Sequence, residues 1–212
     1  SSAGKAVLYV LLIINIAVSL GVKESSVAAL LGTAGVTVGL ALQGGLANLA
    51  GGVLLLLFKP FVVGDYIIQD QSNGCEGTVA KIEICYTTLL SIDNKKIVVP
   101  NGTLSNSTII NVTAKENRKL EIKVGISYEA DIQKAKRIIE KILREDADTK
   151  SDTKEMVVFV DELADSAVIM GLRVWVSTER YWPTKWRLNQ KIKEEFDANG
   201  IVIPYNQMEV YV

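Results

Sequence analysis

The 212-residue sequence has no histidine, two cysteines and four prolines. The lack of histidine excludes catalytic triads built on that residue, histidine general bases and most zinc sites. The two cysteines, Cys75 and Cys85, do not have a metal-site spacing, and we interpret them as reduced thiols in a cytosolic domain. No pattern typical of catalysis occurs. We therefore predict that the protein is not an enzyme and uses no metal or cofactor.

Charge is scarce in residues 1–58, which carry only Lys5, Lys23 and Glu24. Over the whole chain, 23 basic and 24 acidic residues nearly cancel, so no net field would attract nucleic acid. Almost all of these charges follow residue 58. This division predicts a membrane anchor joined to a charged, soluble body.

Two uncharged runs predict transmembrane helices. Ala6–Val22 is near the lower length limit for crossing a bilayer. Ser25–Phe58 would be about 51 Å long as one straight helix, which exceeds the hydrocarbon thickness of roughly 30 Å. A bend is therefore expected, and the adjacent glycines Gly44 and Gly45 are its predicted position.

Basic residues predict the orientation of these helices. Lys5 precedes the first run and Lys59 follows the second, which places both ends on the cytoplasmic side. Lys23 lies at the opposite end, beside Glu24. We expect a multi-pass protein of the inner cell membrane whose C-terminal body is cytoplasmic.

Small residues form two opposite stripes on the second helix. The stripes are Ala28, Gly32, Gly35 and Gly39 on one side, and Leu30, Ala34, Thr37 and Ala41 on the other. Two such stripes allow a like helix to pack on each side, which can close into a ring. The alternative is a glycine-rich hairpin that only packs. In a ring, one of two flanks would line a central pore: Thr33, Val36 and Leu40, or Leu31, Val38 and Leu42.

The rest of the sequence predicts two β-containing domains. Five short strands between Asp65 and Val112 suggest a small closed or partly closed barrel. From residue 118 to 205 the order strand–helix–strand–strand–helix suggests a split α+β sandwich. Glu209–Val212 predicts a short terminal strand without a partner in its own chain, which we expect to pair with copies of itself.

The motif G-x-x-V-G-L-A-L-Q-G-x-L-x-N-L-x-x-G, from Gly35 to Gly52, resembles the pore helix of the MscS family of small-conductance mechanosensitive channels. The similarity continues through Phe58-Lys-Pro-Phe, Gly64-Asp-Tyr, Gly77-Thr-Val, Val99-Pro-Asn-Gly and Phe196 to Glu209. The resemblance implies a homoheptameric channel, opened by membrane tension, that releases ions and small solutes on hypo-osmotic shock. Its implied partners are membrane lipid, copies of itself and the permeant solutes, but not nucleic acid.

The resemblance also implies a fold. It is an α-helical membrane region followed by an Sm-like β-barrel domain, an α+β domain of ferredoxin-like type, and a C-terminal strand that forms a barrel between subunits. The family's first transmembrane helix is then expected to be missing, since Ala6–Val22 corresponds to the second. The expected divisions are residues 1–24, 25–58, 59–115, 116–205 and 206–212.

The family pattern implies roles for particular residues of the pore helix. The pore constriction falls on Val36 and Leu40, which selects the first of the two flanks. The other expected roles are helix packing and gating for Gly32, Gly35, Gly39, Ala34, Thr37 and Ala41, hinges at Gly44, Gly45 and Gly52, and docking to the β domain for Asn48.

Two other functions are compatible with the sequence. A ligand-modulated channel of the same family is one. A membrane-anchored RNA-binding module is the other, but the mildly acidic body and the lack of a basic, aromatic-rich stripe oppose it.

Overall fold

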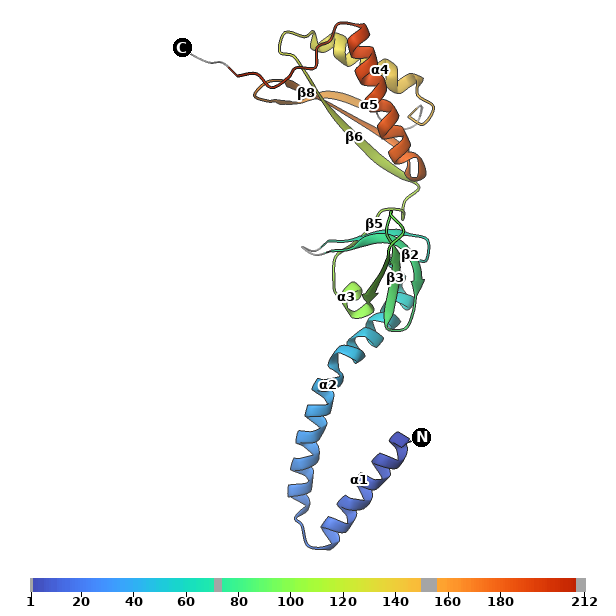
Figure 1. Ribbon diagram of the computed structural model, residues 1–212, viewed down its shortest axis with the longest axis vertical. Helices are drawn as coiled ribbons and strands as arrows, with labels where there is room; N and C mark the ends of the chain where they lie inside the picture. The colour runs from blue at the N-terminus through green and yellow to red at the C-terminus, as the bar shows by residue number, and fades with distance from the viewer. Residues whose placement is uncertain (1, 71–73, 150–155, 209–212) are drawn as a thin grey trace. The chain divides into compact units, whose positions relative to one another are not determined.

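The computed structural model describes residues 2–70, 74–149 and 156–208. The chain divides into two compact units, Ser1–Asn111 and Val112–Val212. The N-terminal unit contains two helices and a β domain, and the C-terminal unit contains a second sheet with two helices (Figure 1).

The N-terminal helices are α1, Ser2–Ser19, and α2, Glu24–Phe58. They are joined by a short turn in which Gly21 adopts a left-handed φ of 93°. In the described residues, α2 is the one helix long and apolar enough to cross a membrane, because the apolar part of α1, Leu8–Ser19, is shorter. The α2 helix is continuous, and its ribbon bends part-way along its length (Figure 1).

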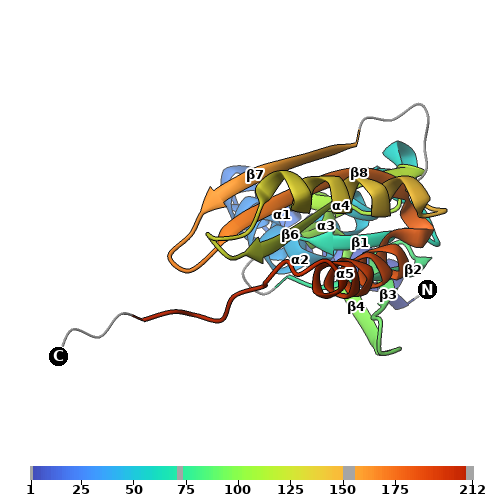
Figure 2. The ribbon, with the colours of Figure 1, turned by 90° about the horizontal axis from the view of Figure 1, so that it is seen from above.

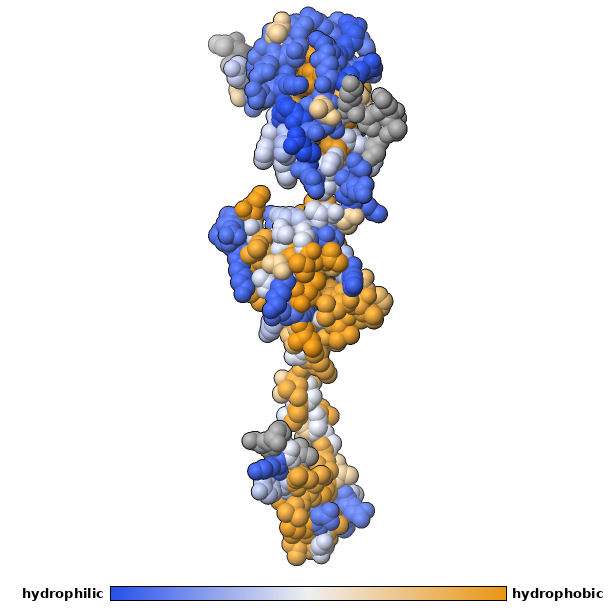
Figure 3. All heavy atoms as spheres, turned by 90° about the vertical axis from the view of Figure 1, so that its right-hand side faces the viewer, coloured by the Kyte–Doolittle hydropathy of each residue, from blue (hydrophilic) through white to orange (hydrophobic). Residues whose placement is uncertain are grey.

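On the face shown in Figure 3, hydrophobic residues predominate on α1 and α2, whereas hydrophilic residues predominate on the C-terminal unit. Large apolar side chains such as Leu30, Leu46 and Leu57 are exposed in the single chain. Contiguous exposed apolar surface of this extent is typical of contact with lipid or with another protein surface.

The β domain contains β1 (Tyr66–Gln69), β2 (Glu76–Ile82), β3 (Tyr86–Leu90), β4 (Lys96–Pro100), α3 (Asn101–Ser105) and β5 (Ile109–Asn111). Its strands pair antiparallel in the order β4-β3-β2-β1-β5. The strands coincide closely with the five predicted from the sequence. Strands β4 and β5 form the two edges of the sheet, and α3 lies between them in sequence.

A compact core joins the end of α2 to this sheet. It contains Leu55 of α2, Phe61 of the following segment, and the inward residues of the domain: Ile67, Val79, Leu89, Val99 and Leu104. Phe61 is 1% exposed, so the chain leaving α2 is anchored in the core of the β domain.

The C-terminal unit contains β6 (Asn117–Ile126), α4 (Ile132–Glu145), β7 (Val157–Leu163), β8 (Val168–Ser177), the 3₁₀ turn Thr178–Arg180 and α5 (Tyr181–Ala198). The strands pair antiparallel in the order β6-β8-β7. Asp131 caps α4, accepting hydrogen bonds from the N–H groups of Gln133 and Lys134.

Both helices cover one face of this sheet. Alternate residues of β6 and β8, such as Leu120 and Val174, face the helices and are buried together with Ile139 of α4 and Phe196 of α5. Among the described residues after α5, 199–208, no strand is present; Ile201 is buried in the core, and the end of this described segment extends away from the helices (Figure 2). The terminal strand predicted at 209–212 lies outside the described residues.

Candidate functional site

The predicted constriction and packing residues lie on the exposed part of α2. Val36 and Leu40, one helical turn apart, are 64% and 66% exposed. A Cβ atom added at Gly32, Gly35 or Gly39 would meet no atom within 4 Å in the part of the chain that the structure describes. The predicted stripe with Ala34, Thr37 and Ala41 is exposed as well. Their roles in the pore remain predictions.

The two threonine hydroxyls of this segment are already satisfied inside the helix. Thr33 Oγ1 donates to Ala29 O at 3.0 Å, and Thr37 Oγ1 donates to Thr33 O at 2.9 Å. A hydroxyl bonded to a carbonyl one turn earlier has its donor satisfied within its own helix. The predicted packing surface around Thr37 is therefore small and weakly polar, which suits close contact between helices.

The glycines proposed as hinges have two different environments. A Cβ at Gly44 or Gly45 would meet nothing within 4 Å. At Gly52, by contrast, a Cβ would lie 1.9 Å from Ile84 O and 2.7 Å from Asn101 Nδ2. The hinge roles remain predictions, but the structure gives Gly52 a separate reason to be glycine: the β domain approaches the helix backbone there.

Asn48 and Gly51 extend this contact by one helical turn. Asn48 Oδ1 accepts a hydrogen bond of 3.0 Å from the N–H of Gly102. A Cβ at Gly51 would lie 2.7 Å from the carbonyl of Asn101, and one at Gly102 would lie 2.8 Å from Asn48 Oδ1. The small-residue face of the C-terminal half of α2 thus packs closely on the start of α3.

Asn101 organises the β-domain side of the contact. It is fully buried; its N–H donates to Cys85 O at 2.9 Å and its Nδ2 donates to Glu83 O at 2.8 Å. Its Oδ1 accepts from Thr87 Oγ1 at 2.7 Å. The short helix α3 begins at Asn101. One buried side chain therefore fixes the β2–β3 loop under α2.

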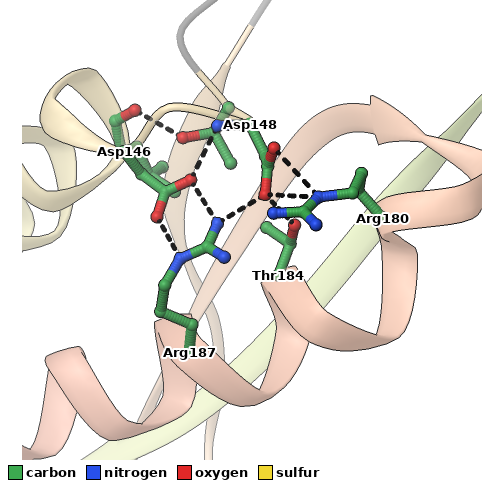
Figure 4. A network of polar contacts seen from close by, with 7 residues as sticks. Asp146, Asp148, Arg180, Thr184 and Arg187 are labelled. Atoms are coloured by element: carbon green, nitrogen blue, oxygen red, sulfur yellow. Dashed lines mark hydrogen bonds and ion pairs between the residues drawn. The ribbon is translucent and has the colours of Figure 1, made fainter.

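The C-terminal unit contains a partly buried ionic network centred on the buried carboxylate of Asp146 (Figure 4). Arg187 of α5 donates through Nε to Asp146 at 2.7 Å and through one terminal nitrogen to both Asp146 and Asp148, at 2.8 and 2.7 Å. Thr184 Oγ1 donates to Asp148 at 2.9 Å, and Arg180 lies 3.4 Å from the same carboxylate. The network joins the end of α4 to α5.

Arg187 controls the ionisation of this network. Burial alone would raise the pKa of Asp146, but the hydrogen bonds from Arg187 and from the N–H of Asp148 outweigh it and lower that pKa below its ordinary value. Hydrogen bonds from Arg187 likewise lower the pKa of Asp148. The carboxylates in turn raise the pKa of Arg187. All three groups are therefore charged in the folded protein at neutral pH.

Comparison with known proteins covers most of the chain. The family model described as "Mechanosensitive ion channel, beta-domain" matches residues 45–114. The family model described as "Mechanosensitive ion channel MscS, C-terminal" matches residues 120–203. A protein of Synechocystis sp. described as an uncharacterized MscS family protein is 36% identical over all of this chain and 71% of its own length.

The chain belongs to the MscS family. The small-conductance mechanosensitive channel of Edwardsiella ictaluri is 40% identical over 84% of this chain and 61% of its own. The crystal structure of Helicobacter pylori MscS in its closed state matches with a TM-score of 0.87 and 31% identity, covering 98% of this chain and 82% of that one. The chain spans about two thirds of the length of such curated relatives.

The boundaries of the MscS family models agree with the packing of α2. The β-domain model begins at residue 45, inside the helix, and so includes Asn48, Gly51 and Gly52. These residues contact the β domain directly. The C-terminal half of α2 is thus part of the β domain in both sequence and packing.

We expect Arg187→Leu to destabilise the C-terminal unit by about 3 kcal/mol, the lower end for breaking a buried pair, because the guanidinium is one-third exposed and Asp146 keeps, of its described contacts, only the hydrogen bond from the N–H of Asp148. The matched change Arg173→Leu, in the exposed pair with Glu121, should cost much less, because solvent screens an exposed pair. All three tryptophans lie in this unit, so their fluorescence during thermal unfolding in detergent measures both effects.

The same ionic network predicts that the stability of the folded protein depends on pH. The depressed pKa values of Asp146 and Asp148 stabilise the folded state above the ordinary aspartate pKa of about 3.9, and this contribution disappears as the pH falls through the folded values. Acidification below about pH 4 should therefore destabilise the wild type more than Arg187→Leu. Equal acid sensitivity of the two proteins would contradict this assignment.

Proposed function

We propose that the protein is a mechanosensitive channel, opened by membrane tension, that passes ions and small solutes during hypo-osmotic shock. The observation that carries the proposal is the division of α2. Its N-terminal part exposes small residues and the apolar pair Val36 and Leu40, while its C-terminal part is packed on a β domain of MscS type. Relatives described as a small-conductance mechanosensitive channel and as MscS support it.

The finer architecture is part of the proposal. The sheet order β4-β3-β2-β1-β5 supports an Sm-like barrel domain, and the order β6-β8-β7 around α4 and α5 supports a ferredoxin-like domain. We propose a homoheptamer in the inner membrane with both domains in the cytoplasm and residues 206–212 forming a barrel between subunits. Both α1 and α2 would cross the membrane.

The proposed mechanism depends on the in-plane area that the channel gains on opening and on the hydration of its pore. Tension does work in proportion to the in-plane area that a channel gains on opening, so stretch favours a wider ring of α2 helices. Rings of Val36 and Leu40 close the pore by excluding water, and separating the helices rewets it. Contacts at Gly32, Gly35 and Gly39 allow neighbouring helices to slide, because no side chain obstructs them.

The docking of Asn48 on Gly102 holds a non-conducting state in this scheme. The bond of 3.0 Å and the close approach at Gly51 and Gly52 fix the C-terminal half of α2 to the β domain. The bend near Gly44 and Gly45 determines the direction in which the N-terminal half leaves this fixed point. A straighter helix strains the docking.

Gly44→Ala is expected to reduce the decay of current under sustained pressure. Alanine favours the straight helix by roughly 1 kcal/mol, and no atom lies near enough to oppose the added methyl group. The measurement is the decay time in excised patches held at constant suction. Unchanged decay in both Gly44→Ala and Gly45→Ala would place the hinge elsewhere.

Patch clamp of the protein in liposomes tests the proposed function. Suction applied without any added ligand should open channels reproducibly, and protein-free liposomes should remain silent. Current that appears only after a cytoplasmic solute is added would instead support the ligand-modulated alternative. Silence under both conditions, from protein shown to be inserted and folded, would refute channel function.

A further inference from the structure

The segment that joins α2 to β1, residues 59–65, is held by one carboxylate. Asp65 Oδ2 accepts a hydrogen bond of 2.8 Å from the N–H of Val62 and another of 2.8 Å from Asn111 Nδ2. Asn111 Nδ2 also donates to Pro60 O at 3.3 Å. The Asn111 side chain thus donates hydrogen bonds to Pro60, near the start of the segment, and to Asp65, at its end. Bonds to a carboxylate are stronger than those between neutral groups.

The backbone of this segment is fixed as well. Lys59 caps α2 in the left-handed conformation, with its N–H bonded to Leu55 O at 3.0 Å. Gly64 donates to Val79 O, and Val79 donates to Asp65 O, both at 2.8 Å. With Phe61 buried, the segment has little freedom of its own. A change in the direction of α2 must therefore act on its hydrogen bonds.

Asn111 lies at the boundary between the two units. It is the last residue of β5, paired with Ile67 of β1, and it is the last residue of the N-terminal unit. The chain continues from it directly into the C-terminal unit. The side chain that bonds the exit of α2 therefore belongs to the residue from which the connection to the second unit starts.

We propose that Asp65 and Asn111 form a latch that couples the end of α2 to the connection between the two units. The proposal rests on the channel function proposed above. Both are positioning residues, which act on gating through α2. With the latch closed, reorientation of α2 must also move the residues that lead into the C-terminal unit. With the latch broken, α2 reorients alone and less of the protein rearranges on opening.

Three variants test the latch. Asn111→Asp removes the amide donor and places a second carboxylate beside Asp65. Adding Asp65→Asn exchanges the amide and the carboxylate, which restores a bond between the two side chains and keeps an acceptor for the N–H of Val62. The control is Asn199→Asp in the C-terminal unit, which likewise removes an amide donor and places a carboxylate beside another, that of Glu195.

Channel currents provide the first measurement. Asn111→Asp should raise the ratio of open to closed channels at a fixed sub-maximal suction about 2- to 30-fold, the range for changes in a coupling network. The double variant should return most of the way to wild type, and Asn199→Asp should not change the ratio. No change in Asn111→Asp, or no rescue in the double variant, would overturn the latch while leaving the proposed function intact.

Hydrogen exchange of the full chain in detergent gives a measurement that does not need current. Asp65→Ala should speed exchange both in residues 59–65 and in residues 112–116, although Asp65 lies far from the latter in sequence. Faster exchange confined to 59–65 would reduce Asp65 to a local turn residue and refute the latch. If the wild type carries no tension-activated current, the proposed function fails, and exchange alone decides whether the coupling exists.

Discussion

Leu40→Ser is expected to give a channel that opens at much lower tension and leaks at rest. The serine hydroxyl binds water where a ring of leucines excludes it, so the closed pore loses its barrier to hydration. Cells that express the variant should grow slowly in medium of low osmolarity. In patches, the suction for half-maximal opening should fall well below that of the wild type.

Leu42→Ser is the matched control, because it distinguishes the two flanks of α2. Leu42 has the same side chain, is 62% exposed against 66% for Leu40, and lies on the flank assigned away from the pore. Its replacement should leave growth and opening pressure close to wild type. If Leu42→Ser leaked and Leu40→Ser did not, the pore would be lined by Leu31, Val38 and Leu42 instead, and the flank chosen from the family resemblance would be wrong.

The sequence predicted those elements that depend on local pattern. An uncharged run identified α2, and short strand patterns identified the β domain, because each signal lies within a few neighbouring residues. Helical spacing places Asn48 on the small-residue face of α2, and the family resemblance added the β domain as the surface on which that face docks. Its partner, the N–H of Gly102, is 54 positions away.

The contacts that sequence reasoning missed join residues far apart in the chain. Arg187 and Asp146 are 41 positions apart, and Asn111 and Asp65 are 46 apart. Each looks like an ordinary surface residue in its own segment. The buried role of Asn101 was missed for the same reason, since Thr87 and the β2–β3 loop meet it only after the sheet has formed. No local pattern distinguishes such residues from solvated ones.

The glycines of α2 show most clearly that local sequence does not reveal contacts between distant residues. Gly45 and Gly52 are identical in sequence and lie in one helix, yet one faces open space and the other touches a backbone. Sequence reasoning gave both a hinge role, because paired or isolated glycines in a helix suggest flexibility. Only the packing of the β domain reveals that Gly52 allows close approach.

Gly52→Ala should therefore be strongly disruptive, while Gly45→Ala should be tolerated. The new methyl group at position 52 would lie 1.9 Å from Ile84 O, a backbone atom, so the helix and the loop must separate. Overpacking of this kind costs roughly 1–3 kcal/mol and sometimes more, which exceeds the gain of about 1 kcal/mol in helix propensity. At Gly45 the propensity gain is unopposed.

Hydrogen exchange at the start of α3 measures the difference. Separation of α2 from the β domain removes the acceptor Asn48 Oδ1 from the N–H of Gly102. It also exposes the buried side chain of Asn101 to solvent. Exchange in residues 101–105 should therefore be much faster in Gly52→Ala and unchanged in Gly45→Ala. Equal protection in the two variants would show that the loop around Ile84 yields without cost. The close approach at Gly52 would then not be what holds α2 on the β domain.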